Sequence, residues 1–72
     1  MSVARNTEIS ATSAQSFEDA IRQGLDRATR TLRNVRGAWI KEQEVAVSGD
    51  QISEYKVTMI VTFILDDKSS AE

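Results

Sequence analysis

Two glutamates are spaced so that their carboxylates can act together. Glu42 and Glu44 lie two residues apart in a stretch with strand character, and residues two apart on a strand share one face of the sheet. Carboxylate oxygens are preferred ligands of Ca²⁺ and Mg²⁺, so the pair is a candidate metal site, particularly where symmetry axes multiply it. The alternative is a pair of solvated charges at a strand edge, and no loop motif of the EF-hand type is present.

The single tryptophan, Trp39, is a candidate ligand-binding residue. It follows Gly37 by two residues, so the two share a strand face, and this face is predicted to point away from the helix. An indole ring can stack on a planar ligand, and it can also bury its apolar area against a neighbouring subunit. The sequence leaves both interpretations open.

Five arginines run through a segment with helical periodicity and concentrate positive charge towards its C-terminal half. They are candidates for holding phosphate groups. The alternative is structural, because Glu18 with Arg22 and Asp26 with Arg30 have the i, i+4 spacing of helix ion pairs, and cations near a helix C-terminus complement its dipole. The five residues are Arg22, Arg27, Arg30, Arg33 and Arg36.

The residue types on which most enzymes depend are missing. The chain has no His and no Cys, which excludes disulfides, the common zinc sites and thiol or imidazole chemistry, and it contains no nucleophile elbow or phosphate-binding loop. We therefore expect no enzyme. A net charge of −2 and a pI near 5.0 argue against nucleic acid as a partner. No apolar run has the length of a signal peptide or a membrane helix, so a soluble cytoplasmic protein without membrane contact is expected.

The hydrophobic pattern predicts one helix among three strands. Apolar residues recur at three- and four-residue spacings from Phe17 onwards, and Ser16 with Asp19 has the spacing of a capping box. Gly24 within the apolar stripe indicates a close approach of the helix to a sheet, and Gly37 is available for a positive φ. The predicted parts of the single domain 1–72 are an N-terminal extension 1–6, strands 7–11, 38–47 and 51–65, a helix 17–34 and a tail 66–72.

The last predicted strand has two different faces. Its odd-numbered residues over 55–65 are apolar and are predicted to form the core, whereas Ile60 and Ile64 lie on the mixed opposite face. A change of apolar parity between Ile40 and Val45 predicts either a bulge in the preceding strand or a change of its buried face. One helix cannot cover both faces, and a domain this small buries only about 60% of the surface of its unfolded chain. Association with copies of the same chain is therefore expected.

Several segments, taken in order, resemble the dodecin family over roughly residues 7–66. The resemblance implies an α+β fold of β-α-β-β order, in which a three-stranded antiparallel sheet partly wraps around one helix. It also implies a homododecameric hollow shell, a tetramer of trimers, that binds or stores a ligand without turnover. The segments are Thr7 to Ser13, Ser16-Phe17, Ala20-Ile21, Leu25 to Ala28, Thr31 to Asn34 and Tyr55 to Phe63.

The resemblance also implies a default ligand, a flavin such as riboflavin or FMN, stacked between tryptophans of neighbouring subunits. The position matching the stacking tryptophan is Gly37, and the position matching a flavin-contacting glutamine is Lys56. Trp39 lies about 6–7 Å further along the strand, so a weakened or lost flavin site is expected. The chain is more similar to the branch without this tryptophan, where a calcium-bound form is known. The alternatives are a structural or calcium-binding shell without flavin, and binding of nucleotide or coenzyme A phosphates.

Overall fold

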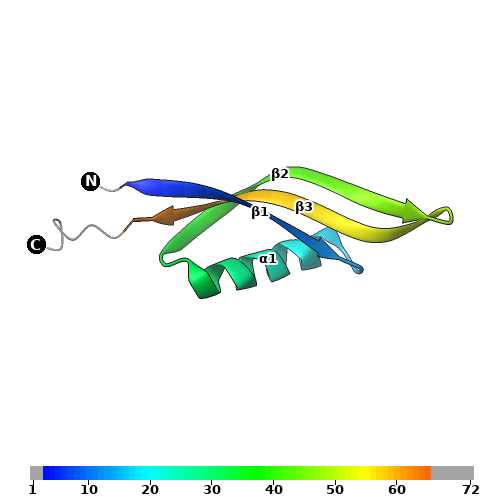
Figure 1. Ribbon diagram of the computed structural model, residues 1–72, viewed down its shortest axis with the longest axis horizontal. Helices are drawn as coiled ribbons and strands as arrows, with labels where there is room; N and C mark the ends of the chain where they lie inside the picture. The colour runs from blue at the N-terminus through cyan, green and yellow to red at the C-terminus, as the bar shows by residue number, and fades with distance from the viewer. Residues whose placement is uncertain (1–2, 66–72) are drawn as a thin grey trace, which may run out of the picture.

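The computed structural model describes residues 3–65, which form one three-stranded sheet with one helix packed on it (Figure 1). The elements follow in the order β1 (Ala4–Ser13), α1 (Phe17–Thr31), β2 (Val35–Ser48) and β3 (Gln51–Ile64). β3 lies between β1 and β2 and pairs antiparallel with both. The α+β class and the β-α-β-β order expected from the sequence are confirmed.

The first strand is longer than the segment 7–11 predicted for it. β1 begins at Ala4, inside the predicted N-terminal extension 1–6, and every residue from Ala4 to Ser13 has a partner on β3. The sequence understates this strand because its outward positions are polar and only Ile9 and Ala11 mark an apolar face. β3 ends at Ile64, one residue before the predicted end, and the predicted tail 66–72 lies outside the described residues.

The helix ends earlier than predicted, at Thr31 instead of residue 34. Leu32 is extended, and its N–H donates to the carbonyl oxygen of Ala28 at 2.8 Å. The positive φ that the following turn requires is taken by Asn34, at 62°, and not by Gly37. Asparagine tolerates this left-handed region better than most residues. β2 therefore starts at Val35, three residues before the predicted strand 38–47, and it continues to Ser48.

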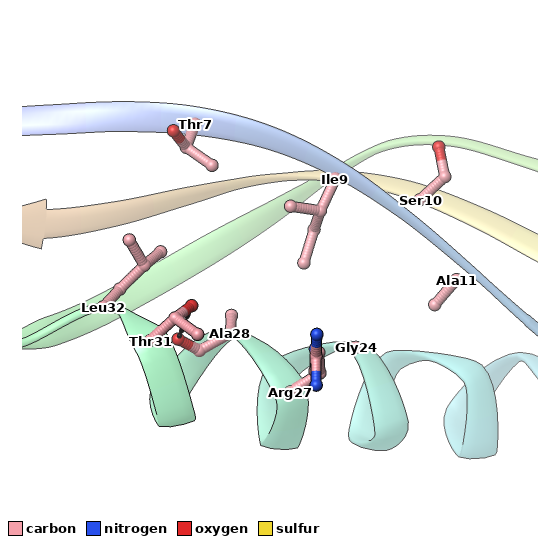
Figure 2. Close-up of a pocket in the computed structure, with 9 residues that line it drawn as sticks. All are labelled: Thr7, Ile9, Ser10, Ala11, Gly24, Arg27, Ala28, Thr31 and Leu32. Carbon is pink, nitrogen blue, oxygen red and sulfur yellow. Dashed lines mark hydrogen bonds between the residues drawn. The ribbon is translucent and has the colours of Figure 1, made fainter.

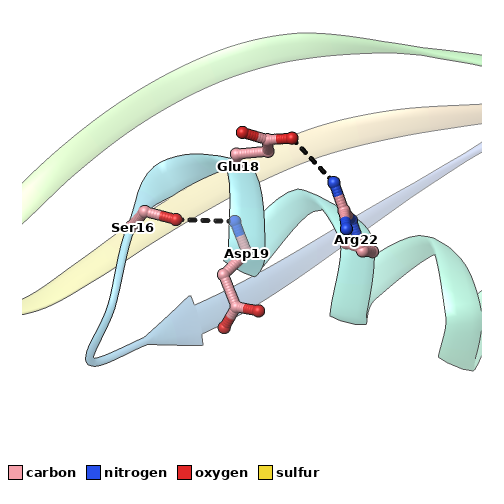
Figure 3. A network of polar contacts seen from close by, with 4 residues as sticks. All are labelled: Ser16, Glu18, Asp19 and Arg22. Atoms are coloured by element: carbon pink, nitrogen blue, oxygen red, sulfur yellow. Dashed lines mark hydrogen bonds and ion pairs between the residues drawn. The ribbon is translucent and has the colours of Figure 1, made fainter.

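Hydroxyl and carboxylate groups hold the start of α1 (Figure 3). Ser16 is the N-cap, and its Oγ accepts a hydrogen bond from the N–H of Asp19 at 2.9 Å. The Asp19 carboxylate does not return this bond as a capping box would, because it accepts from the hydroxyl of buried Ser13 at 2.6 Å and from the amide of Gln23. The Ser13 hydroxyl also accepts from the N–H groups of Gln15 and Ser16, so this network joins the end of β1 to α1.

This network makes the stability of the fold sensitive to acid. The hydrogen bond from Ser13 holds the pKa of the Asp19 carboxyl below its ordinary value, with help from Gln23 and Arg22. A lowered pKa contributes stability above the ordinary value of about 3.9 and loses it as pH falls through the folded value. We expect Asp19→Asn to lower the melting temperature more at pH 7 than at pH 3. Ser13→Ala, which removes the principal cause of the shift, should reduce the same pH-dependent component, and equal losses at both pH values would contradict this account.

The core lies between α1 and the inner face of the sheet, the face that α1 covers. α1 packs on β1 and β3, and small residues on the helix let the backbones approach. A Cβ added at Gly24 would lie 2.6 Å from Met59 Cε and 3.2 Å from Ala11 Cβ, so the predicted close approach at this glycine is present. The fully buried side chains on β3 are those of Val57, Met59 and Val61.

β2 lies beyond the cover of the helix. Its residues from Arg36 to Ser48 are all exposed, and its pairing with β3 shifts register at three places, one of them between Ile40 and Glu42 as the apolar parity predicts. The last residue pair between β1 and β3 is Ser13 with Tyr55. Beyond this pair β2 and β3 continue as a two-stranded hairpin, which projects from one end of the molecule in Figure 1. Within residues 3–65, no helix is long and apolar enough to cross a membrane.

Candidate functional site

The face of the sheet turned away from α1, here called the outer face, carries the predicted site residues. Ile60 on the central strand alternates with the buried residues Met59 and Val61 and pairs with Trp39 on one side and with Glu8 on the other. Partners across an antiparallel sheet share a face, so Trp39 lies on the outer face, as predicted. No helix or strand among the described residues covers this face.

Trp39 and Gly37 form an open apolar place on the outer face. Trp39 is 55% exposed beside half-buried Ile60, although an indole has more apolar area to bury than almost any other side chain. Gly37 pairs with Thr62, and a Cβ built at Gly37 would meet no atom within 4 Å. Because Gly37 has no side chain, a flat ring can approach the backbone of the sheet at this position.

Lys56 lies on the same face but not at the same place. It is four residues from Ile60 along β3, about 13 Å at the rise of a strand, and it pairs with Glu44, whose Oε1 lies 3.9 Å from Lys56 Nζ. The three predicted ligand positions are thus separated, since the structure brings Gly37 and Trp39 together and leaves Lys56 apart. A single small ligand can contact all three only if more than one copy of the chain contributes.

The predicted metal ligands Glu42 and Glu44 share the outer face, opposite Thr58 and Lys56. The ammonium group of Lys56 lies 3.9 Å from Glu44 Oε1 and partly balances its charge. Between residues 3 and 65, no three acidic side chains gather closely enough to hold a metal ion. A cation site built on this pair therefore requires carboxylates from other copies.

Sequence reasoning missed the contribution of β1 to this face. The register brings Glu8 within 3.2 Å of Lys41 Nζ, which donates to it, and brings the hydroxyls of Ser10 and Thr58 to 3.3 Å. Thr58 is buried although no helix covers it. The signal was the run of polar residues at even positions of β1, which is the pattern of a strand with one polar face.

A hollow of about 410 Å³ opens between β1 and the C-terminal half of α1 (Figure 2). Ile9 and Ala11 point into it from β1, towards Ala28 and Leu32 on the helix side. Its lining is mostly apolar, and Arg27 and Thr31 lie on its helical rim. The sequence predicted Ala28 and Leu32 as part of the apolar stripe of the helix, and the space left beside them follows from the small residues Ala11, Gly24 and Ala28.

Two of the five arginines form the ion pairs that the sequence predicts. Arg22 donates to Glu18 at 2.7 Å and Arg30 to Asp26 at 3.0 Å, with all four side chains well exposed. Exposed pairs of this kind contribute little to stability, about 0.3–0.5 kcal/mol each. The structural interpretation is therefore correct for these two arginines.

Known proteins share this arrangement closely. The family model described as Dodecin matches residues 3–66. A dodecin from Streptomyces davaonensis is 36% identical, with a TM-score of 0.87 over 92% of this chain and 97% of its own. A protein from Thermus thermophilus is 31% identical, with a TM-score of 0.88 over 93% of this chain and 98% of its own.

A third similar structure is described as a calcium chelating antigen, calcium dodecin, from Mycobacterium tuberculosis with a novel calcium-binding site. It is 29% identical, with a TM-score of 0.77 over 89% of this chain and 91% of its own. A comparison with curated protein sequences gives no significant match. Because the family model spans nearly all of the described strands and helix, and relatives above 30% identity share the fold over almost their whole length, the chain belongs to the dodecin family.

Proposed function

We propose that this chain assembles into a homododecameric hollow shell, a tetramer of trimers, that binds and stores a planar ligand without catalysing a reaction. The observation that carries the proposal is Trp39, which stands 55% exposed on an uncovered sheet face beside Ile60 and the open space at Gly37. A monomer gains nothing from leaving an indole in water, whereas copies that meet at this face can bury it or clamp a ring against it.

Flavin, as riboflavin or FMN, is the ligand we propose first, with weak affinity. Trp39 supplies an aromatic face and Gly37 supplies room, but Lys56 is about 13 Å further along the sheet and is paired with Glu44. A storage role without turnover agrees with a chain that has no His and no Cys. Its cytoplasmic location stays a prediction from the sequence.

A fluorescence titration with riboflavin and with FMN tests this proposal. We expect flavin fluorescence to be quenched only at ligand concentrations well above micromolar, because Gly37 supplies no stacking ring and Lys56 lies about 13 Å along the sheet, paired with Glu44. Trp39→Ala should abolish the quenching, and Trp39→Phe should keep part of it. Sedimentation of the same samples reports the shell. Quenching that is unchanged in Trp39→Ala, or no quenching at any concentration, would remove flavin as the ligand.

The second candidate is a shell that binds a divalent cation and no flavin. It is supported by the pairing of Glu42 and Glu44 on one face and by the description of the Mycobacterium tuberculosis relative as a calcium-binding dodecin. Ca²⁺ that binds only the folded assembly raises its melting temperature by linkage. This candidate would be favoured if Ca²⁺ raises the melting temperature, a chelator reverses the increase, and Glu42→Gln removes it. Adding coenzyme A in the same assay tests the phosphate-binding alternative.

A further inference from the structure

The end of the β2–β3 hairpin, residues 45–54, is here called the arm. It projects past Ser13, the last residue of β1 to pair with β3, so it has two strands where the rest of the sheet has three (Figure 1). A two-stranded hairpin alone in water is at best marginally stable. The arm nevertheless carries three exposed apolar side chains, Val45, Val47 and Ile52, with Val47 65% exposed.

A register shift places these three side chains on one face. Val45 pairs with Tyr55, whose ring packs edge-on against Phe17 at the start of α1, with centroids 5.1 Å apart, so this is the inner face. Continued pairing would set Ser53 opposite Val47, but the shift between Ala46 and Val47 sets Ile52 there instead. The bulge thus gathers an apolar strip on the inner face, beyond the point where α1 begins.

The arm has apolar side chains with no surface to pack on, whereas the hollow between β1 and α1 is an apolar surface with no side chains to fill it. The hollow is an open groove of about 410 Å³ whose apolar lining includes Ile9, Ala11, Ala28 and Leu32, and apolar side chains of a partner would fill it. It lies away from the arm of the same chain, because its lining residues Ala11 and Thr7 pair with Val57 and Val61, five and nine residues along β3 from Ile52. At strand geometry that separation is about 17–30 Å, so an arm cannot reach its own hollow.

Charge matches the two surfaces. The arm contains Asp50 and Glu54 and no Lys or Arg, a formal charge of −2, whereas residues 26–36 contain four arginines and one Asp, a formal charge of +3, and Arg27 among them lines the hollow. Opposite potentials steer two surfaces together and fix their orientation. A second copy of this chain therefore offers both the apolar strip and the charge that the hollow fits.

We propose that the arm of one copy packs its apolar inner face into the hollow between β1 and α1 of the next copy. The inference rests on the proposed assembly and names the surfaces that build it. Because arm and hollow are different surfaces, the contact runs head to tail and closes into a ring, or pairs two copies reciprocally. Each inner face, half covered by its own helix, is completed by the helix of a neighbour.

Cysteine cross-linking tests the contact, because the chain has no cysteine of its own. A Val47→Cys, Arg27→Cys double variant and a Val47→Cys, Thr31→Cys double variant place one thiol on the arm and one on the hollow. A disulfide needs Cα atoms within about 7 Å, so it must join two chains. We expect covalent dimers and higher species under mild oxidation. Val3→Cys with Arg27→Cys is the matched control, since Val3 is similarly exposed at 58%, and cross-linking no greater than this control would overturn the proposal.

Disruption supplies a second measurement. Val47→Asp sets a charge in the middle of the strip, and because burying an unpaired charge is costly, the assembled fraction at fixed concentration should fall roughly tenfold or more. Val3→Asp should leave assembly unchanged, and circular dichroism checks that both variants are folded. An intact shell in Val47→Asp overturns this contact alone, whereas an unaltered chain that sediments as a monomer overturns the proposed function itself. A hollow filled by a small molecule instead would leave Val47→Asp fully assembled.

Discussion

Gly37→Trp is expected to bind riboflavin or FMN about 5- to 150-fold more tightly than the unaltered chain. Stacking of a base-sized ring on an aromatic side chain is worth about 1–3 kcal/mol, which corresponds to this range of affinity. The fold should accept the change, because nothing lies within 4 Å of the new Cβ and Gly37 does not have a positive φ. Fluorescence quenching during titration, measured side by side on both proteins, gives the ratio.

The matched control for this prediction is Gly37→Leu. It adds a large apolar side chain to the same exposed strand position and removes the same glycine, but it offers no aromatic face. Equal gains in flavin affinity for Gly37→Trp and Gly37→Leu would mean that nonspecific hydrophobic contact or a stiffer strand, and not ring stacking, strengthens binding. No gain in either would mean that the flavin does not reach Gly37, and the planar-ligand proposal would then depend on Trp39 alone.

Local patterns were enough to predict the order of elements and the direction of the buried faces. The three- and four-residue spacing from Phe17 marks an amphipathic helix, and the alternation around Met59 marks the inner face, because both periods follow directly from backbone geometry. Gly24 was informative for the same reason, since a missing side chain in an apolar stripe has meaning only if something approaches closely, and Met59 does.

Features that depend on pairing between distant segments could not be predicted from the sequence. The position of Asn34 in the turn, the extension of β1 back to Ala4 and the approach of Glu8 to Lys41 all follow from register, which a sequence specifies only through partners that are not yet known. The shift between Ala46 and Val47 is of this kind, because the residues alone do not say whether Ser53 or Ile52 faces Val47. The apolar strip on the inner face of the arm therefore depends on the strand register and could not be predicted from the sequence.

The structure leaves two surfaces incomplete, and they differ in kind. The outer face around Trp39 is mixed, with Glu8, Lys41 and Ser10 close to Ile60, as expected of a wet surface that holds a ligand or a polar interface. The inner face of the arm is apolar and continues the core past Tyr55. On the two proposals made above, variants of Val47 should change mainly the assembled fraction, and variants of Trp39 should change mainly ligand binding.

Met59→Ala is expected to lower the free energy of unfolding by about 2–5 kcal/mol, the usual cost of removing a buried Met, Leu or Ile side chain. Met59 is fully buried on the central strand. A domain of this length typically has about 4–11 kcal/mol in total, so the variant should be close to unfolding unless assembly supports it. Denaturant titration at several protein concentrations separates the two contributions. Met59→Leu, which keeps most of the volume, should cost less than about 1.5 kcal/mol.

A substitution at Gly24 tests whether the loss of stability in Met59→Ala comes from a cavity between the helix and the sheet. Gly24→Ala alone gains about 1 kcal/mol in helix propensity but crowds the core, because the new Cβ would lie 2.6 Å from Met59 Cε. That atom ends a flexible side chain and can turn aside, so we expect the net change in the free energy of unfolding to be small. In the Met59→Ala background that Cε is absent, so the same change should stabilise by filling part of the cavity. A larger stabilisation by Gly24→Ala in the Met59→Ala background than in the unaltered chain is the expected result of the double-mutant cycle. If Gly24→Ala had the same effect in both backgrounds, the contact between Gly24 and Met59 would not be what sets the distance of the helix from the sheet.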